Sequence, residues 1–301
     1  MSGLSTAAQA RGNLRGAALM AVVAVLFAVE AMFVRWMTAR GVPVTTQLLF
    51  RAGGQLAWTL PLLLRAGPAL YASRHKKLHL LRGSCSLATW ALYYFSLTQL
   101  DLASAMVLSF TNVMITTIAA GPVLGEKVGP ARWAGVLAGF AGVCLMLQPW
   151  EGAGLLLSAP LGVAAGLAAS VTWCGLTLST RMLTRTEGTG TILGWVGLVT
   201  FVGVLPFAAA GWQPLDGGDW LLLLLFAVVT PSIILLMTEA FRAGEASAIG
   251  PFQYLRLPVA ALFGWLFWGD VPGPTMALGA ALIVFAGLYI LHREMRRRAK
   301  R

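Results

Sequence analysis

The chain has 301 residues, of which 58% are hydrophobic and only 11% charged, and its formal net charge is +11. Soluble domains carry about 25% charged residues, so this composition excludes an ordinary soluble protein and indicates one embedded in a membrane. The mean hydropathy of +0.77 agrees with this interpretation. Cys85, Cys144 and Cys174 lie far apart within apolar runs, which predicts packing residues rather than a metal site, and we expect no cofactor.

Apolar runs of about twenty residues follow one another along the chain, each long enough to cross a hydrocarbon core of roughly 30 Å. The sequence therefore predicts an all-α membrane protein with ten transmembrane helices and short loops. The expected spans are residues 16–37, 44–64, 79–99, 103–124, 130–148, 159–181, 189–209, 219–242, 245–268 and 274–292.

Basic residues are distributed unevenly between the two sides of these spans. If the N-terminus lies in the cytoplasm, most of the 22 Lys and Arg residues fall on inner loops and inner span ends, above all within 65–82 and 293–301. The outer side then holds only Arg35 and Arg40. Cytoplasmic loops are enriched in Lys and Arg. We therefore expect a multi-pass protein of the bacterial inner membrane with both termini in the cytoplasm, and no nucleic-acid partner.

The first two spans carry polar residues at mid-membrane depth. Glu30 lies in the first span, whereas Gln47, Arg51 and Gln55 recur every four residues in the second and so share one helix face. Glu30 and Arg51 lie at similar depth on sequential helices and can therefore pair. A charge in hydrocarbon is costly unless it is paired or hydrated. Two interpretations stay open: a cation or proton site at Glu30, or a static ion pair with Arg51.

Later spans add aromatic and amide side chains at comparable depth. Trp90, Tyr93 and Tyr94 lie in the third span, Asn112 in the fourth and Trp173 in the sixth. Such aromatic residues can surround an apolar or cationic substrate, or they can simply pack and anchor helices. The sequence leaves both interpretations open.

The run over residues 250–270, GPFQYLRLPVAALFGWLFWGD, combines the length of a span with Gln253, Arg256 and the helix-breaking Pro258. In a bilayer these groups must face protein or a water-filled cavity. The ending Gly269-Asp270 repeats Gly125-Glu126 at an offset of about half the chain. An internal repeat with polar groups at mid-depth is typical of transporters.

Because each repeat contains five spans, the second repeat must enter the membrane from the opposite side, which predicts two inverted five-helix repeats. The expected organisation is a first repeat over residues 1–148, a connector over 149–158, a second repeat over 159–292 and a basic cytoplasmic tail over 293–301.

Pairs of small residues four apart, Gly135 with Gly139 and Gly162 with Gly166, allow close contact between helices. They fit packing within one chain or an interface between two chains. We therefore expect a monomer or a weak homodimer.

Several segments resemble a known family: GVPVTTQLLFR in the second span, LASAMVLSF and GPVLGEKVGPARWAGVLAGFAGV in the fourth and fifth, and YLRLPVAALFGWLFWGD in the ninth. Together they resemble the drug/metabolite transporter superfamily, EamA type, over nearly the whole chain. The resemblance implies ten helices in inverted repeats around a central cavity. It also matches Arg51, Arg35 and Pro258 to residues of the family pattern. Met114 stands at the first-repeat position that corresponds to Pro258, so we expect a bend in the second half only.

These observations predict a secondary transporter that moves a small organic metabolite, an amino acid or a related compound, by alternating access. An amino acid would offer its ammonium group to Glu30 and its carboxylate to Arg51 or Arg256. The alternative is a proton-coupled exporter of aromatic or cationic compounds, in which Glu30 alternates between a proton and a cation. The candidate substrate-binding residues are Glu30, Gln47, Arg51, Trp90, Tyr94, Asn112, Trp173, Gln253 and Arg256.

An enzyme is not expected, because His75, His79 and His292 lie near span ends without a carboxylate at catalytic spacing in the sequence. The expected partners are a small-molecule substrate and the lipid bilayer, with protons open as a coupling ion. We expect no metal.

Overall fold

The computed structural model describes residues 2–124, 155–183, 186–243, 255–271 and 273–282, together with a few short pieces between 133 and 145 and between 284 and 289. This part of the chain is helical nearly throughout and contains no strand. Most of the expected fifth span, most of the connector, the N-terminal part of the ninth span and the basic tail lie outside the described residues.

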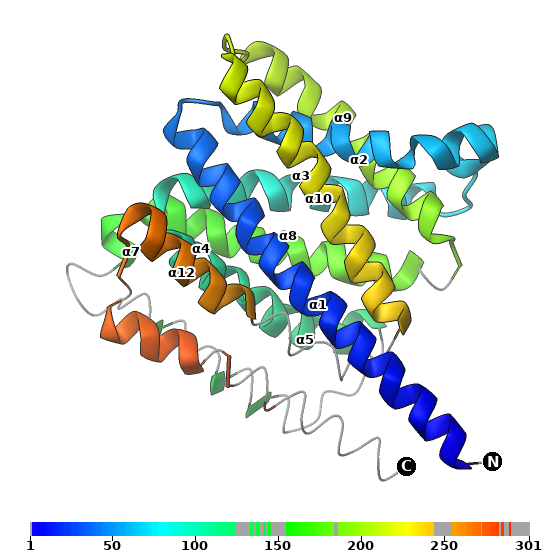
Figure 1. The fold of residues 1–301 in the computed structure, drawn as a ribbon, viewed down its shortest axis with the longest axis horizontal. Coiled ribbons are helices and arrows are strands. Elements are labelled where there is room, and N and C mark those ends of the chain that lie inside the picture. The colour runs from blue at the N-terminus through cyan, green and yellow to red at the C-terminus, as the bar shows by residue number, and fades with distance from the viewer. Residues whose placement is uncertain are drawn as a thin grey trace.

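The helices follow one another with short connections (Figure 1). The first half contains α1 (Ser2–Ala39), α2 (Val44–Ala66), the 3-10 helix η1 (Gly67–Tyr71), α3 (Lys76–Gln99), α4 (Leu102–Ser109) and α5 (Thr111–Leu124). The second half contains α7 (Leu155–Ser158), α8 (Pro160–Leu183), α9 (Thr189–Ala210), α10 (Gly217–Ala243) and α12 (Arg256–Trp268), and residues 274–282 are also helical.

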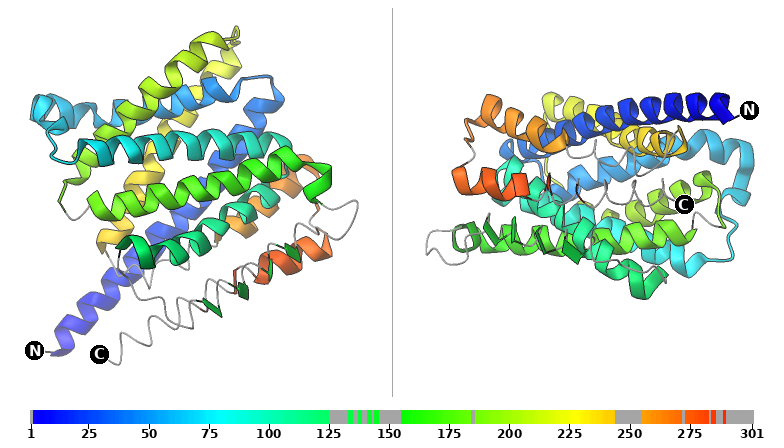
Figure 2. Two further views of the ribbon diagram at one scale, coloured as in Figure 1. Left: turned by 180° about the vertical axis from the view of Figure 1, so that it is seen from behind. Right: turned by 90° about the horizontal axis from the view of Figure 1, so that it is seen from below.

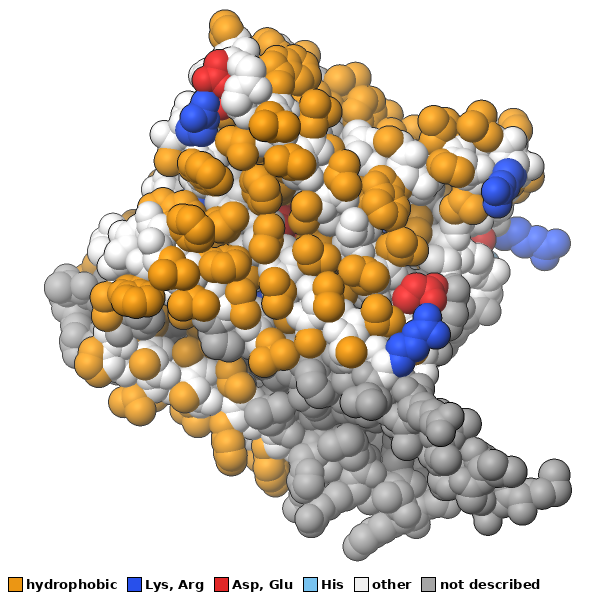
Figure 3. All heavy atoms as spheres, in the orientation of Figure 1, with side chains coloured by type: hydrophobic (Ala, Val, Ile, Leu, Met, Phe, Trp, Pro, Cys, Tyr) orange, Lys and Arg blue, Asp and Glu red, His pale blue; other side chains and the backbone are white. Residues whose placement is uncertain are grey.

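Much of the surface is apolar, as a membrane-embedded protein requires. Four of the described helices contain windows long and apolar enough to span a bilayer: Ala18–Ala39, Pro160–Thr180, Thr189–Ala210 and Gly217–Met237. Large side chains such as Leu161, Phe207 and Leu221 are exposed on them. Figure 3 shows hydrophobic side chains over most of the described face, with the visible charged groups mainly near its edges. These exposed side chains have a natural partner in lipid tails.

The contacts between helices follow the same pattern in both repeats. When 144 is added to the residue numbers of α2 (Val44–Ala66), the result is 188–210, which matches α9 (Thr189–Ala210) to within one residue. By the same offset, α1 corresponds to α8 and α3 corresponds to α10. Accordingly, α1 packs on α10 as α3 packs on α8, and α2 packs on α9 (Figure 2). The contacts between the two halves are therefore related by a pseudo-twofold axis.

Two loop contacts show that the second half is inverted relative to the first. Arg40, after α1, forms ion pairs of 2.7 Å with Asp216, between α9 and α10, and with Asp219, in the first turn of α10. At the opposite end, the Ser73 hydroxyl, between α2 and α3, donates to Glu187 Oε1, between α8 and α9, at 2.5 Å. The first loop of one half thus meets the second loop of the other half at each end, as inverted repeats require.

The fourth span departs from expectation, because it is broken into α4 and α5 at Phe110. The backbone N–H of Phe110 donates to Val107 O at 3.0 Å, three residues back. The side-chain amide of Asn112 donates to Ser109 O at 2.5 Å. The prediction of a bend confined to the second half is therefore wrong: local hydrogen bonding interrupts this helix without a proline.

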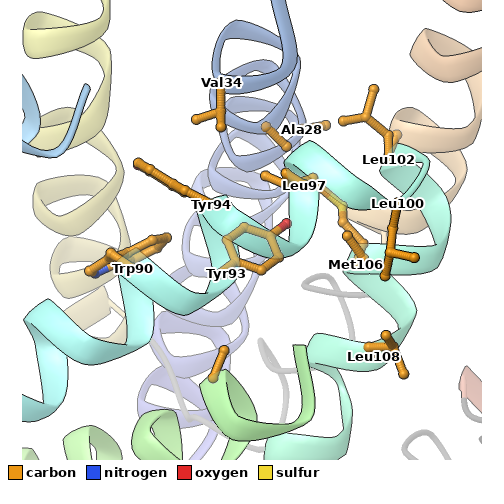
Figure 4. Close-up of a cluster of buried hydrophobic side chains, with 14 of the residues drawn as sticks. Ala28, Val34, Trp90, Tyr93, Tyr94, Leu97, Leu100, Leu102, Met106 and Leu108 are labelled. Atoms are coloured by element: carbon orange, nitrogen blue, oxygen red, sulfur yellow. The ribbon is translucent and has the colours of Figure 1, made fainter. Parts of the chain in front are cut away.

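The core lies where α3 crosses α1. Trp90, Tyr93, Tyr94 and Leu97 of α3 all belong to one buried cluster, and Tyr94 is fully buried. Figure 4 shows these side chains beside Ala28 and Val34 of α1 and next to residues of α4. Small residues also tighten the packing within the chain. A Cβ added at Gly162 would lie 2.7 Å from Gln99 Cβ, so this glycine serves intrachain packing of α8 on α3.

Candidate functional site

The buried ion pair between α1 and α2 is the centre of the site. Arg51 Nε donates to Glu30 Oε1 at 3.0 Å, and the two side chains are 6% and 1% exposed. Arg51 Nε also lies 2.9 Å from the Tyr94 hydroxyl, which in turn donates to Glu30 Oε1. Three helices of the first half therefore converge on one polar triad. Burial of either charge alone would be costly, so Glu30 and Arg51 stabilise each other within the protein.

Trp90 holds the guanidinium of Arg51 from its other side. Arg51 Cζ lies 3.6 Å from the ring centroid of Trp90, one turn before Tyr94 on α3. A cation over an indole face is attracted by the ring quadrupole, and the attraction grows when water is excluded. This contact and the Glu30 bond together fix the plane of the guanidinium group.

An aromatic cluster extends from Trp90 toward the second half. It consists of Phe27 of α1, Trp90 and Tyr93 of α3, and Trp173 of α8. The ring centroids of Trp90 and Trp173 lie 5.5 Å apart, and Phe27 stacks on Trp90 at 6.3 Å with an interplanar angle of 17°. Such separations are typical of favourable aromatic pairs. Because Trp90 and Trp173 come from different halves, the cluster spans the interface between the two halves.

Arg256 of α12 lies at the far end of this cluster. Its Nη2 donates to the Ser109 hydroxyl at 3.2 Å, and its Cζ lies 4.1 Å from the ring centroid of Phe110. The ring of Trp173 is 5.6 Å from the same Cζ. The break between α4 and α5 thus places Ser109 and Phe110 against a buried guanidinium. The aromatic cluster has an arginine at each end.

The remaining predicted site residues lie differently. Gln47 is buried, but its amide donates to Thr38 Oγ1 and to Val42 O, both at 3.0 Å, so it fastens the turn between α1 and α2. Asn112 of α5 is also buried, and its amide donates to Ser109 O at the end of α4, across the break between the two helices. Gln253 lies outside the described residues. The structure therefore brings together Glu30, Arg51, Trp90, Tyr94, Trp173 and Arg256.

Three partners were not singled out from the sequence. Phe27 belongs to the aromatic cluster, and Ser109 and Phe110 contact Arg256. Phe27 lies three residues before Glu30, which places both on one face of α1. That spacing was the available sequence signal, whereas the contact of Ser109 with Arg256 joins residues 147 positions apart and depends on the fold.

A small pocket lies beside Arg51, between α2, α3 and α9. Drug-sized ligands need pockets of about 300–1,000 Å³, and this one is far too small to hold such a ligand. Its lining residues are Leu48, Arg51, Ala52, Leu87, Trp90 and Thr200.

Ion pairs close the end of the molecule beyond the site. Arg35, in the last turns of α1, pairs with Asp270 after α12, and its Cζ lies 4.5 Å from the ring centroid of Trp268. Nearby, Asp216 and Asp219 cap α10 reciprocally, each accepting the backbone N–H of the other. The hydrogen bond from the Asp219 N–H, with Arg40 close by, holds the pKa of Asp216 below its ordinary value.

A second polar contact closes the opposite end. Glu187 Oε1 accepts from the Ser73 hydroxyl and lies 3.5 Å from His75 Nδ1 and 3.9 Å from His79 Nε2. The Ser73 bond is the main reason that the pKa of Glu187 lies below its ordinary value. The sequence gives no sign of this contact, because Glu187 is more than one hundred residues away from both histidines in the chain. The arrangement ties one half to the other.

Comparison with known proteins agrees with this architecture. The model of the EamA-like transporter family matches residues 14–148 and again residues 160–292. A solved crystal structure superposes with a TM-score of 0.62 at 19% identity, covering 97% of this chain and all of the other, which supports the fold alone.

Several relatives of similar length are bacterial transporters. The riboflavin transporter of Rhizobium johnstonii is 33% identical over 95% of this chain and 93% of its own length. The riboflavin transporter of Brucella anthropi is 28% identical over 85% and 91%. The S-adenosylmethionine uptake transporter of Rickettsia felis is 24% identical over 78% of both chains. With its two family matches and its two inverted helical halves, this chain belongs to the EamA-like transporter family.

Proposed function

We propose that this protein is a secondary transporter for riboflavin or a closely similar flavin. The observation that supports the proposal most strongly is the buried aromatic cluster of Phe27, Trp90, Tyr93 and Trp173, with Arg51 and Arg256 at its ends. A flavin has a large planar ring system that stacks on aromatic side chains. It also has ring carbonyl groups that accept hydrogen bonds from guanidinium groups.

The relatives support the same substrate class. Riboflavin transporters from Rhizobium johnstonii and Brucella anthropi align with most of this chain. Aromatic and arginine side chains from α1, α2, α3, α8 and α12 provide the surfaces that a planar heterocycle requires. We place the protein in the bacterial inner membrane with both termini in the cytoplasm, in keeping with its basic inner loops.

An amino-acid substrate finds no support in the relatives, and the site gives a physical reason against it. The carboxylate of Glu30 was expected to receive the ammonium group of an amino acid. Its Oε1 instead accepts from both Arg51 and Tyr94. A second cation at Glu30 would have to lie close to the Arg51 guanidinium in a medium of low dielectric constant, where like charges repel strongly.

A cationic substrate is the second candidate, because a relative from Rickettsia felis takes up S-adenosylmethionine. In the present site two arginines flank the aromatic cluster, which disfavours a sulfonium cation relative to a neutral ring. The alternative of a proton-coupled exporter requires Glu30 to leave Arg51 during the cycle. Binding measurements with both ligands separate these candidates.

Purified protein in detergent should bind riboflavin, and binding should quench flavin fluorescence and raise the thermal unfolding temperature by mass action. S-adenosylmethionine and free amino acids should leave that temperature unchanged. Trp173→Leu should weaken riboflavin binding, whereas Trp58→Leu, at an exposed tryptophan of α2, should not. Stabilisation by S-adenosylmethionine but not by riboflavin would overturn the proposal.

A further inference from the structure

The Glu30–Arg51 pair leaves one atom of each group without a hydrogen-bond partner among the described residues. These atoms are Glu30 Oε2, an acceptor, and Arg51 Nη2, a donor, and both are shielded from solvent. Buried polar atoms in folded proteins nearly always have a partner, and those of charged groups have the most to lose without one. Such a pair of atoms therefore calls for a ligand group or a water molecule.

The two atoms belong to side chains that are in direct contact. Arg51 Nε and Glu30 Oε1 meet at 3.0 Å, and the Tyr94 hydroxyl bonds to these same two atoms. The second oxygen of the carboxylate and one terminal nitrogen of the guanidinium group take no part in that contact. The stacking of Arg51 on Trp90 holds the donor in a fixed plane. The polar triad thus offers one acceptor and one donor, from two bonded side chains, at the edge of an aromatic cluster.

Electrostatics decides which donor can meet Glu30 Oε2. An ammonium ion there would lie within a few ångströms of the Arg51 guanidinium, with little water to screen the repulsion. A neutral N–H group avoids this cost. The partner of Arg51 Nη2, in turn, must be an acceptor such as a carbonyl oxygen. The complementary ligand edge is therefore an uncharged ring N–H adjacent to a ring carbonyl.

We propose that Glu30 and Arg51 are specificity-determining residues that read this edge of a planar heterocycle, the imide edge of the flavin ring. Glu30 Oε2 accepts the hydrogen bond of the ring N–H, and Arg51 Nη2 donates to the neighbouring carbonyl. The ring face meets the aromatic side chains when the two halves separate to admit it. This inference rests on the proposed function and assigns the orientation of the substrate within it.

A site built to pair with a ring N–H rejects analogues that lack it, because its own polar atoms then stay buried and unpaired. The test compares riboflavin with 3-methylriboflavin, in which a methyl group replaces the hydrogen of the imide nitrogen. Wild-type protein should bind the methylated analogue at least about tenfold more weakly. Lumiflavin, which keeps the imide edge and lacks the ribityl chain, should still compete with riboflavin.

The double variant Glu30→Gln/Arg51→Gln provides the matched comparison, because it removes both charges together and leaves neither unpaired. In this variant the preference for riboflavin over 3-methylriboflavin should fall below about twofold, as expected when the discriminating hydrogen bonds are lost. Trp58→Leu, at an exposed position on α2, should keep the full preference. Discrimination that persists in the double variant would trace to the bulk of the methyl group and overturn the inference.

The outcomes separate this inference from the proposed function. Equal binding of riboflavin and 3-methylriboflavin by the wild type would mean that water satisfies Glu30 Oε2 and Arg51 Nη2. The imide assignment would then be wrong, and the flavin transporter would stand. Absence of binding for riboflavin, lumiflavin and the methylated analogue alike would instead contradict the proposed function itself.

Discussion

Glu30 and Arg51, on adjacent helices, share a hydrogen bond of 3.0 Å inside the protein, with side chains that are 1% and 6% exposed. Such a pair is costly to break, because removal of one partner leaves an uncompensated buried charge. Glu30→Gln and Arg51→Gln should each lower the free energy of unfolding in detergent by about 3–5 kcal/mol.

The double variant Glu30→Gln/Arg51→Gln should recover part of that loss, which a double-mutant cycle of thermal or denaturant unfolding will measure. Arg65→Gln serves as the control and should change the free energy of unfolding little, because Arg65 is exposed near the end of α2, the helix that carries Arg51. Losses that simply add in the double variant would show that the two residues do not interact.

Arg35 and Asp270 connect the two halves at one end of the molecule, with a second contact of 3.4 Å between Nη2 and Oδ1. If this pair holds that end closed, Arg35→Asp and Asp270→Arg should each slow transport, because like charges would then face each other. The combined charge swap should restore at least half of the rate. Wild-type rates in both single variants would exclude a role for the pair in the transport cycle.

Gly54 of α2 allows the closest approach between α2 and α10. A Cβ added there would overlap the backbone carbonyl of Ala227, which cannot move away as a flexible side chain could. Gly54→Ala should therefore destabilise the protein by about 1–3 kcal/mol, as overpacking of a core does. Gly53→Ala is the matched control, because its Cβ would meet the ring of Phe201 at an ordinary 3.6 Å. Equal unfolding temperatures for the two variants would contradict the close crossing.

The orientation in the membrane is open to chemical labelling. In a background without Cys85, Cys144 and Cys174, we expect Gly217→Cys to react with an impermeant thiol reagent added outside intact cells. Arg74→Cys should react only after the membrane is opened, because it lies at the other end of the molecule. Both positions are exposed. The reverse pattern would show that the basic loops face outward and that both termini do too.

The polar centre could be predicted from the sequence because depth along a helix follows from residue number. Glu30 and Arg51 fall at the same depth on sequential spans, and the structure confirms that they pair. The inverted halves were predictable from the expected number of spans, since two repeats with an odd number of spans each must enter from opposite sides. The first inference needs only the rise per residue of a helix, and the second needs only the number of spans that fit across the bilayer.

Other features depend on contacts that no local pattern encodes. No proline or glycine at Phe110 indicates the helix break in the sequence. The break depends on hydrogen bonds of Val107, Ser109 and Asn112. The Glu187 contact with Ser73 joins loops 114 residues apart. Gln47 shares a helix face with Arg51, yet the turn after α1 uses its amide. The expectation of an amino-acid substrate placed an ammonium group at Glu30, whereas the Arg51 guanidinium already lies against Oε1 and would repel a second cation.

Uptake of labelled riboflavin into proteoliposomes is the most direct test of the central claim. Vesicles with the wild-type protein should accumulate label by counterflow against internal unlabelled riboflavin, with saturation at high concentration. The Glu30→Gln/Arg51→Gln variant should fold but transport poorly, and Trp58→Leu should match the wild type. Saturable counterflow of riboflavin is the result that the account predicts. Protein that is folded and correctly inserted, yet exchanges S-adenosylmethionine or an amino acid and not riboflavin, would contradict it.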